Sequence, residues 1–267
     1  MLQYPDIDPV AISLGPVEIH WYGIMYLIGF GAAWILGKKR ASRPGSGWNH
    51  EQISDMIFYG ALGVVLGGRI GYMLFYNFGS LVENPLSLFL IWRGGMSFHG
   101  GFLGVLFVAF LYGRKYKKSL IEVMDFVAPL VPIGLAAGRL GNFIGAELYG
   151  RATDVPWGMV FPGDPEQLLR HPSQLYQAGL EGMTLFVILW IYSAKPRPAF
   201  AVSGMFCLGY GLLRSFAEFF RQPDAGFDFV AFNWMTMGQV LSAPMIVFGA
   251  AVLYLAYTQN FFDKAKA

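Results

Sequence analysis

The sequence predicts an all-α polytopic membrane protein with about seven transmembrane helices, on three observations. Hydrophobic residues make up 55% of the chain and charged residues only 13%, whereas soluble domains carry about 25% charged residues. Apolar stretches long enough to span a bilayer, about twenty residues each, recur along the chain. Short clusters of lysine and arginine follow alternate stretches, as expected of loops that stay in the cytoplasm.

The apolar stretches define the candidate spans. In order, they are residues 17–37, 52–76, 96–113, 120–144, 174–193, 200–219 and 236–257. Basic clusters follow the first, third, fifth and seventh spans, at residues 38–43, 114–118, 195–197 and 264–266. This bias predicts that the N-terminus lies outside and the C-terminus in the cytoplasm.

We expect a single membrane-embedded domain over residues 1–267, because neither a repeat nor a long linker divides the chain. The connections on the outer side are longer than the inner ones and are rich in proline, glycine and aromatic residues. They are expected to cover the outer face, over residues 77–95, 145–173 and 220–235. The N-terminus lacks the basic region of a cleavable signal peptide, so we expect the first span to act as its own anchor.

Composition excludes several classes of function. A formal net charge of +2 without a basic stripe gives no reason to expect a nucleic-acid partner. Cys207 is the only cysteine, which excludes an intrachain disulfide and a cysteine-rich metal site. The histidines lack paired ligand spacing, so we expect neither a metal nor another cofactor.

Arginines inside the spans point to a functional site. Arg69, Arg139 and Arg214 each lie in a span that enters from the cytoplasm, nearer to its outer end. A central arginine costs roughly 2.5 to 3.5 kcal/mol to insert, so its default interpretation is functional. The structural alternative is an ion pair with a neighbouring carboxylate, and for Arg69 an ion pair and a phosphate contact are equally open. Glycines at four-residue spacing around Arg69 predict close packing of another helix, at Gly63, Gly67 and Gly71.

The sixth span carries further polar groups on one stripe. Successive spacings of four, four and three residues place four side chains on one helix face, namely Tyr210, Arg214, Glu218 and Arg221. A self-paired Arg214–Glu218 ladder that lowers the cost of insertion is the structural alternative. Taken with the other arginines, the stripe favours an anionic ligand that enters from the outer leaflet, where a phospholipid head group is the commonest anion.

Several short motifs accompany these charges. The longest is Gly-Arg-x-Gly-Asn-Phe followed by Glu, two residues and Gly, over 138–150. Others are His-Trp-Tyr-Gly at 20–23, His-Gly-Gly-x-x-Gly at 99–104, His-Pro-Ser-Gln-Leu-Tyr at 171–176 and the run 209–224. Together they resemble the bacterial prolipoprotein diacylglyceryl transferases over nearly the whole chain. Two positions depart from that family: Gly145 stands where it usually has Asn, and Phe102 where it usually has Leu.

The resemblance implies a reaction and its partners. It implies transfer of the diacylglyceryl group from phosphatidylglycerol to the lipobox cysteine thiol of a prolipoprotein, which forms a thioether and releases glycerol phosphate. The implied partners are phosphatidylglycerol, the prolipoprotein signal peptide with its lipobox cysteine, and the lipid bilayer. The implied location is the bacterial inner membrane, with the catalytic site of the single domain facing the outer leaflet.

The resemblance also implies catalytic roles. His99 is the expected general base, with His171 or a carboxylate as the alternatives. Arg139 and Arg214 are expected to clamp the phosphate, because guanidinium groups stay charged and offer two parallel donors to one anion.

Other candidates are expected to bind or orient the substrate. Tyr22 and Asn142 would orient it, while Glu147 and Glu218 would hold the arginines or act on a proton. The remaining substrate-binding candidates are His20, Arg69, Gly150, His171, Tyr210 and Arg221.

Two other classes of function are open on the residues alone. A transporter or flippase for an anionic lipid or solute would also need arginines inside the membrane, but such proteins commonly show two related halves with broken helices. The sequence shows no such symmetry. A scaffold for membrane assembly would give no reason for charged and polar groups at one level of the membrane.

Overall fold

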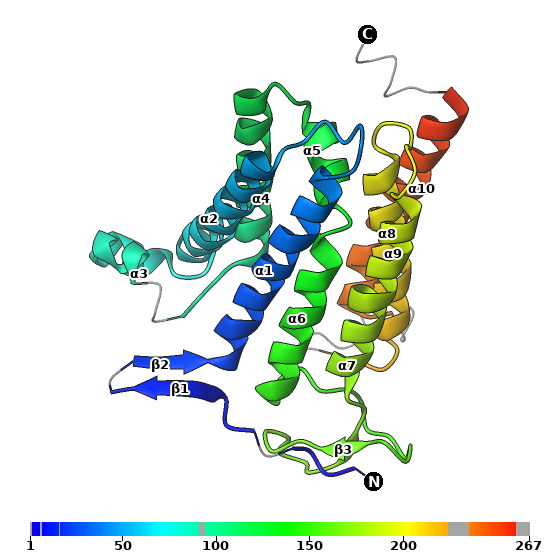
Figure 1. Cartoon of the computed structure of the whole chain (residues 1–267). Helices are drawn as coiled ribbons and strands as arrows, with labels where there is room; N and C mark the ends of the chain where they lie inside the picture. The colour runs from blue at the N-terminus through cyan, green and yellow to red at the C-terminus, as the bar shows by residue number, and fades with distance from the viewer. Residues whose placement is uncertain (1, 6, 16, 91–93, 224–234, 260–267) are drawn as a thin grey trace. The chain divides into compact units, whose positions relative to one another are not determined.

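The computed structural model describes residues 2–5, 7–15, 17–90, 94–223 and 235–259, and these are mostly helical (Figure 1). They form two compact units. One consists of Met1–Ala33 with Asp125–Ala267, and the other of Trp34–Met124. The mostly helical architecture confirms the predicted class in its coarse form.

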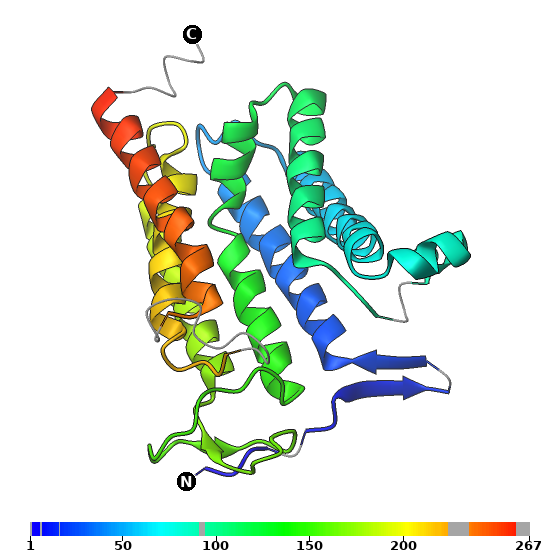
Figure 2. The ribbon, with the colours of Figure 1, turned by 180° about the vertical axis from the view of Figure 1, so that it is seen from behind.

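Helices make up most of the first unit. They are α6 (Val131–Ile144), α7 (Ser173–Gln177), a π-helical segment (Ala178–Thr184), α8 (Leu185–Tyr192), α9 (Ala201–Ala217) and α10 (Met237–Gln259). Helices α7 and α8 and the π-helical segment between them form one continuous rod, Ser173–Tyr192. Helices α9 and α10 lie side by side, as both views show (Figures 1 and 2). The rod packs on α6 through Gly182, where a Cβ atom would come within 2.5 Å of the Ala136 Cβ.

A carboxylate from another helix caps the start of α9. Asp125, near the end of α5 (Leu120–Val127), accepts hydrogen bonds from the backbone N–H groups of Phe200 (2.7 Å) and Ser203 (2.8 Å). Unpaired N–H groups at a helix N-terminus favour a negative charge. The contact therefore fixes the helix that carries Arg214 and Glu218.

The first predicted span, residues 17–37, begins too early. Helix α1 starts at Trp21 and ends at Ala41, and residues 17–20 belong to strand β2 (Val17–His20), which pairs with β1 (Val10–Leu14) in an antiparallel hairpin. Gly15, with φ +62°, lies in the turn between them. Val17 and Ile19 alternate with the polar Glu18 and His20, a strand pattern that a twenty-residue hydropathy window averages away.

The fourth predicted span, residues 120–144, is interrupted. Helices α5 and α6 form a bent pair with a break at residues 128–130. Pro129 lies in the break and Pro132 in the first turn of α6. Because proline has no N–H and clashes with the preceding turn, a continuous helix is unfavourable here.

The second unit contains a glycine-mediated helix pair. Its elements are α2 (His50–Phe75), α3 (Phe78–Glu83), a 3₁₀ turn (Pro85–Phe89) and α4 (Phe98–Tyr116). A Cβ at Gly67 would lie 2.9 Å from the Gly104 Cα, and one at Gly71 would lie 2.7 Å from the Gly100 Cα. The predicted close packing at the glycine face of the second span is confirmed.

The number of membrane crossings is established only in part. Three helices of the described chain are long and apolar enough to span a bilayer, and the bent pair would be a fourth. The three are His50–Phe75, Ser173–Tyr192 and Met237–Thr258. Helix occurs within each predicted span, but the total of seven and the orientation of the termini stay predictions.

The predicted outer loop 145–173 is folded onto the N-terminal segment. It contains the short strands β3 (Met159–Val160) and β4 (Leu169–Arg170), and Leu2 pairs with Met159. The Tyr4 ring contacts the rings of Phe143 and Phe161 at centroid distances of 5.3 and 5.0 Å. Its hydroxyl donates to the last carbonyls of α6, at Phe143 and Ile144. Residues 91–93 and 224–234 of the other two predicted outer loops lie outside the described chain.

Candidate active site

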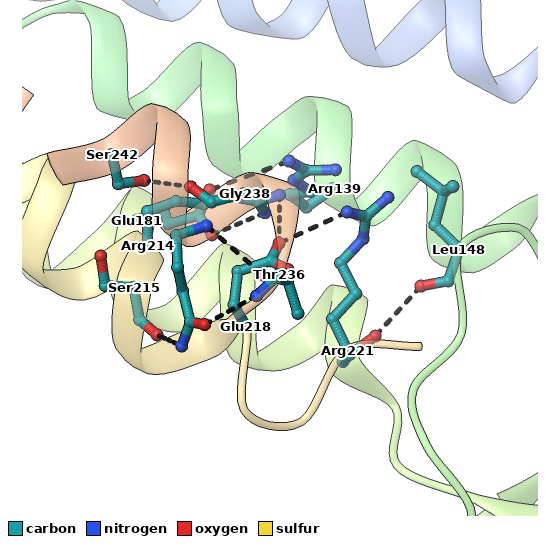
Figure 3. Close-up of polar contacts among 12 residues, drawn as sticks. Arg139, Leu148, Glu181, Arg214, Ser215, Glu218, Arg221, Thr236, Gly238 and Ser242 are labelled. Carbon is teal, nitrogen blue, oxygen red and sulfur yellow. Dashed lines mark hydrogen bonds and ion pairs between the residues drawn. The ribbon is translucent and has the colours of Figure 1, made fainter. Parts of the chain in front are cut away.

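Three arginines and two glutamates from separate helices converge in the first unit (Figure 3). Arg139 comes from α6, Glu181 from the π-helical segment, and Arg214 from α9. Glu218 ends α9, and Arg221 follows it. We call these five residues the arginine cluster. Three positive and two negative side chains leave the cluster with a formal excess of one positive charge.

Glu181 joins two of the arginines and was missed by the sequence reasoning. It is 1% exposed, and its carboxylate lies 3.8 Å from the Arg139 Nη2 and 3.2 Å from the Arg214 Nη1. The available signal was a lone carboxylate in the apolar window 174–193, which is as costly to insert as a lone arginine. The π-helical segment that carries it has i→i+5 bonding, which is often found at functional sites.

Glu218 is the second centre of the cluster. Its carboxylate pairs with Arg214, accepts from the Arg221 Nη1 at 3.3 Å, and accepts from the Thr236 hydroxyl at 2.9 Å. Gly238 in the first turn of α10 makes room, since a Cβ there would lie 2.5 Å from the Glu218 Cδ. The Arg214–Glu218 ladder considered from the sequence therefore exists.

Arg139 and Arg214 differ in how far their donors are occupied. Arg214 contacts both carboxylates of the cluster, one of them through a hydrogen bond of 3.2 Å to Glu181. Arg139 has an ion pair with Glu181 at 3.8 Å, which is too long for a hydrogen bond. It makes no hydrogen bond to any residue that the structure describes. The Arg139 guanidinium is thus the one of the pair with donors available to an anion.

Three more predicted residues lie beside the cluster. Tyr210 is close enough to Arg139 and Arg214 for an electrostatic interaction. Asn142 is buried on α6, one turn beyond Arg139. Tyr22 packs against the same helix, where a Cβ at Gly141 would lie 3.0 Å from its ring. The Tyr22 hydroxyl is 3.3 Å from that of Tyr26.

Glu147 does not hold an arginine in the described chain. Its side chain is exposed, and no basic side chain among the described residues lies within ion-pair distance of it. The role of tying Arg139 and Arg214 together belongs to Glu181, so that part of the prediction for Glu147 is replaced. A role for Glu147 in proton transfer stays a prediction.

Gly145, the departure from the family pattern, ends α6 without strain. Its φ is −76°, and a Cβ there would meet only ordinary van der Waals contacts, the nearest at 3.5 Å. The left-handed backbone of this turn falls instead on Ala146 (φ 53°) and Leu148 (φ 57°). An asparagine at position 145 would therefore fit the same turn.

Gly150 and His171 join the outer loop to the end of α9. The Gly150 N–H donates to the His171 carbonyl at 2.8 Å, and Gly150 pairs with Arg221 in a β-bridge. A Cβ at Gly150 would lie 2.6 Å from the His171 carbonyl oxygen. The His171 Nδ1 is 3.1 Å from the Tyr176 hydroxyl, and burial lowers the pKa of the imidazole from its usual 6.5.

The remaining candidates are not part of the arginine cluster. His20 is exposed at the end of β2, 4.0 Å from Glu18. His99 and Arg69 belong to the second unit. His99 is exposed in the first turn of α4, after the cap formed by Ser97, which accepts from the Gly100 N–H at 3.2 Å.

Arg69 is buried and fully engaged with backbone. Its guanidinium donates to four carbonyl oxygens, at distances of 2.5 to 3.3 Å, from Ser87, Leu88, Gly94 and Gly95. An arginine that donates to several backbone carbonyls stabilises the conformation of the loop that carries them. No carboxylate among the described residues pairs with Arg69, so the ion pair weighed from the sequence is absent there, and the phosphate contact stays a prediction.

Comparison with known proteins places the chain in a family. The family model for prolipoprotein diacylglyceryl transferase matches residues 9–255. The chain is 59% identical over 262 residues to the phosphatidylglycerol–prolipoprotein diacylglyceryl transferase of Pseudomonas putida (strain W619), covering 97% of each protein. It is 57% identical over 265 residues to the protein of that name from Marinomonas sp. (strain MWYL1), covering 99% of this chain and 98% of the relative. The chain belongs to the prolipoprotein diacylglyceryl transferase family.

Proposed function

We propose that this chain transfers the diacylglyceryl group of phosphatidylglycerol to the lipobox cysteine thiol of a prolipoprotein. The relatives carry both substrates in their names. The observation in the structure that supports the assignment most is the Arg139 guanidinium, with donors free of described partners in a cluster of net positive charge. A phosphodiester is an anion that can accept from such donors.

Phosphate recognition has two parts. Arg139 donates in a fork to two phosphate oxygens, a geometry that a lysine cannot provide. Arg214 is held by Glu181 and Glu218 and supplies positive potential from a fixed position. Because these groups are already in place, they stabilise the charge that builds on the phosphate as it leaves.

The bond changes follow from the two substrates. The thiolate sulfur attacks the carbon of the diacylglyceryl group that carries the phosphate, the C–O bond breaks, and its electron pair leaves with glycerol phosphate. A thiol must lose its proton before it becomes a good nucleophile. A general base is therefore required within reach of the incoming cysteine.

His99 stays our first candidate for that base. Its exposed imidazole has no described partner that would occupy its nitrogens. His171 is the alternative, since its lowered pKa keeps the imidazole neutral and able to accept a proton, although its Nδ1 faces Tyr176. Glu147, an exposed carboxylate in the turn that follows α6, is the carboxylate alternative.

The other predicted residues bind and orient the substrates. Tyr22, Asn142 and Tyr210 offer polar groups around Arg139. Gly150 lets the outer loop approach the turn that carries Arg221. The assignments of His20 and Arg69 to substrate binding rest on the family resemblance alone.

The cellular setting completes the proposal. Seven spans, an outer N-terminus and a cytoplasmic C-terminus would place the outer ends of α6 and α9 toward the outer leaflet of the bacterial inner membrane. Phosphatidylglycerol would enter laterally from the bilayer. The signal peptide of the prolipoprotein would present its cysteine at the same level.

The test is direct. Purified protein in detergent is incubated with phosphatidylglycerol labelled in its acyl chains and with a lipobox peptide. We expect a labelled thioether on the peptide and release of glycerol phosphate in equal amount, and no product with a peptide whose cysteine is replaced by serine. If the same protein, reconstituted into vesicles, moved labelled lipid from one leaflet to the other without modifying the peptide, the result would favour a flippase and contradict the proposal.

A further inference from the structure

Gln177 is a buried amide without described partners. Its side chain is 0% exposed, and neither its Oε1 nor its Nε2 forms a hydrogen bond with any residue that the structure describes. Burying an amide without compensation is unfavourable, and nearly all buried polar side chains have a partner. An unoccupied donor and acceptor on one side chain therefore call for a ligand or water that supplies both.

Gln177 lies on the polar stripe that leads to the arginine cluster. Gln174, Gln177 and Glu181 are spaced by three and four residues, so they share one face of the rod. The Gln174 Nε2 donates to the Glu147 carbonyl at 2.5 Å, just beyond α6, and Glu181 contacts Arg139 within α6. Gln177 lies on the rod between these two contacts. The Gln174 Oε1 is also buried without a described partner.

The order of these groups suits a small polyol attached to a phosphate. Gln177 precedes the π-helical segment that carries Glu181, and Glu181 contacts both Arg139 and Arg214. A phosphoglycerol group carries its hydroxyls on the carbons beyond the ester carbon, so they extend away from the phosphate that the arginines would hold. An amide donates and accepts, as a hydroxyl does, whereas an anion needs donors only.

We propose that Gln177 binds the hydroxyl groups of the phosphoglycerol head of the bound lipid and so selects this head group over other anionic phospholipids. The inference rests on the proposed function, because Arg139 must hold the phosphate for the glycerol to reach Gln177. The arginine cluster recognises the charge of the phosphate and does not distinguish head groups that differ beyond it. Gln177 supplies the missing discrimination.

The experiment compares two lipids of equal charge. Phosphatidylethanol has the same phosphodiester as phosphatidylglycerol but no head-group hydroxyls, and it would release ethyl phosphate. We measure kcat/KM for both with the full-length Gln177→Met and Gln177→Leu variants, which keep the volume and remove the hydrogen bonds. We expect the rate with phosphatidylglycerol to fall about three- to tenfold, as for the loss of one or two hydrogen bonds, and the rate with phosphatidylethanol to change less than about twofold.

Gln239 provides the matched control. It is also a buried glutamine, but its amide is occupied, with the Nε2 donating to Ser215 (3.2 Å) and the Oε1 accepting from Thr236 (3.0 Å). Gln239→Met should lower thermal stability and leave the ratio of the two lipid rates unchanged. Gln177→Met should keep or raise thermal stability, and it should lower the ratio of the phosphatidylglycerol rate to the phosphatidylethanol rate.

Two results would overturn the inference. If kcat/KM of a folded Gln177 variant fell equally with both lipids, or with neither, the amide would bind only water and not the head group. Weaker inhibition by free glycerol phosphate with unchanged lipid kinetics would assign the amide to the released product. A wild-type protein inactive with both lipids would contradict the proposed function itself, so the two failures are distinguishable.

Discussion

Replacing Arg139 by lysine separates the geometry of the guanidinium from its charge. In the structure, Arg139 has a 3.8 Å ion pair with Glu181 and no described hydrogen bond, so its fold-stabilising contacts are few. A lysine keeps the positive charge but replaces a fork of donors with a single ammonium. We therefore expect Arg139→Lys to fold normally and to fail in catalysis almost as badly as Arg139→Ala.

The magnitude follows from the bond that is lost. Going from two parallel charge-assisted bonds to one in the transition state costs about 1.5 to 3 kcal/mol, which is roughly a tenfold to hundredfold loss in kcat. Misalignment of the phosphate with the attacking sulfur should add to this loss. The assay is thioether formation on a lipobox peptide at saturating phosphatidylglycerol, with thermal unfolding followed in the same detergent.

Arg214 provides the contrast. It pairs with two carboxylates that are each 1% exposed. Arg214→Ala should destabilise the fold by about 3 kcal/mol, because two buried carboxylates each lose one of their two arginine partners. A well-folded Arg139→Lys protein that kept most of the wild-type rate would refute the reasoning, and the phosphate clamp would then have to be moved to Arg214.

Four further outcomes are expected. Reporter fusions should give cytoplasmic signals after Arg40, Lys118 and Lys195 and outer signals within 77–95 and 145–173, and an outer signal at Lys118 would contradict the topology. Cys207→Ala and Cys207→Ser should keep activity within about twofold of wild type, because this half-buried thiol behaves as a small apolar side chain and the substrate brings its own. Tyr4→Phe should keep the ring contacts but lose the hydrogen bonds to the end of α6, lowering stability by about 1 kcal/mol in thermal melts. Arg170 holds the pKa of Asp164 below its usual 3.8, so this carboxylate stabilises the fold above about pH 4 and progressively less as the pH falls through its folded pKa. Asp164→Asn should lower the free energy of unfolding by about 3 kcal/mol near neutral pH. The difference in unfolding free energy between this variant and the wild type should disappear in acid.

The helices could be predicted from the sequence because membrane spans leave a strong local signal. Twenty apolar residues must form a helix in a bilayer, where backbone groups have no water to bond with. The same logic misplaced residues 17–20, since the alternation of Val17 and Ile19 with the polar Glu18 and His20 is a strand signal that averaging over a twenty-residue window hides. The break at 128–130 was foreshadowed by Pro129 and Pro132, which were not weighed.

Only part of the arginine cluster could be predicted from the sequence. Charges at helical spacing identified Arg214, Glu218 and Arg221 as one stripe, and the structure shows their pairing. Glu181 was missed because a single carboxylate in an apolar window was given less weight than an arginine. The tie between Arg139 and Arg214 depends on which way a neighbouring helix turns, and this is a tertiary property that no local pattern contains.

The π-helical segment Ala178–Thr184 gives its rod a defined place at which its length can change. A π-helix holds an extra residue within its turn, so deleting one residue there would let the segment return to α-helix and leave the flanking turns close to their present register. A deletion within α7 would instead turn Gln174 by about 100° about the axis relative to Glu181, and the contacts of these two residues with Glu147 and Arg139 could not both be kept. We therefore expect natural length changes of this rod to fall in the π-helical segment and not in α7.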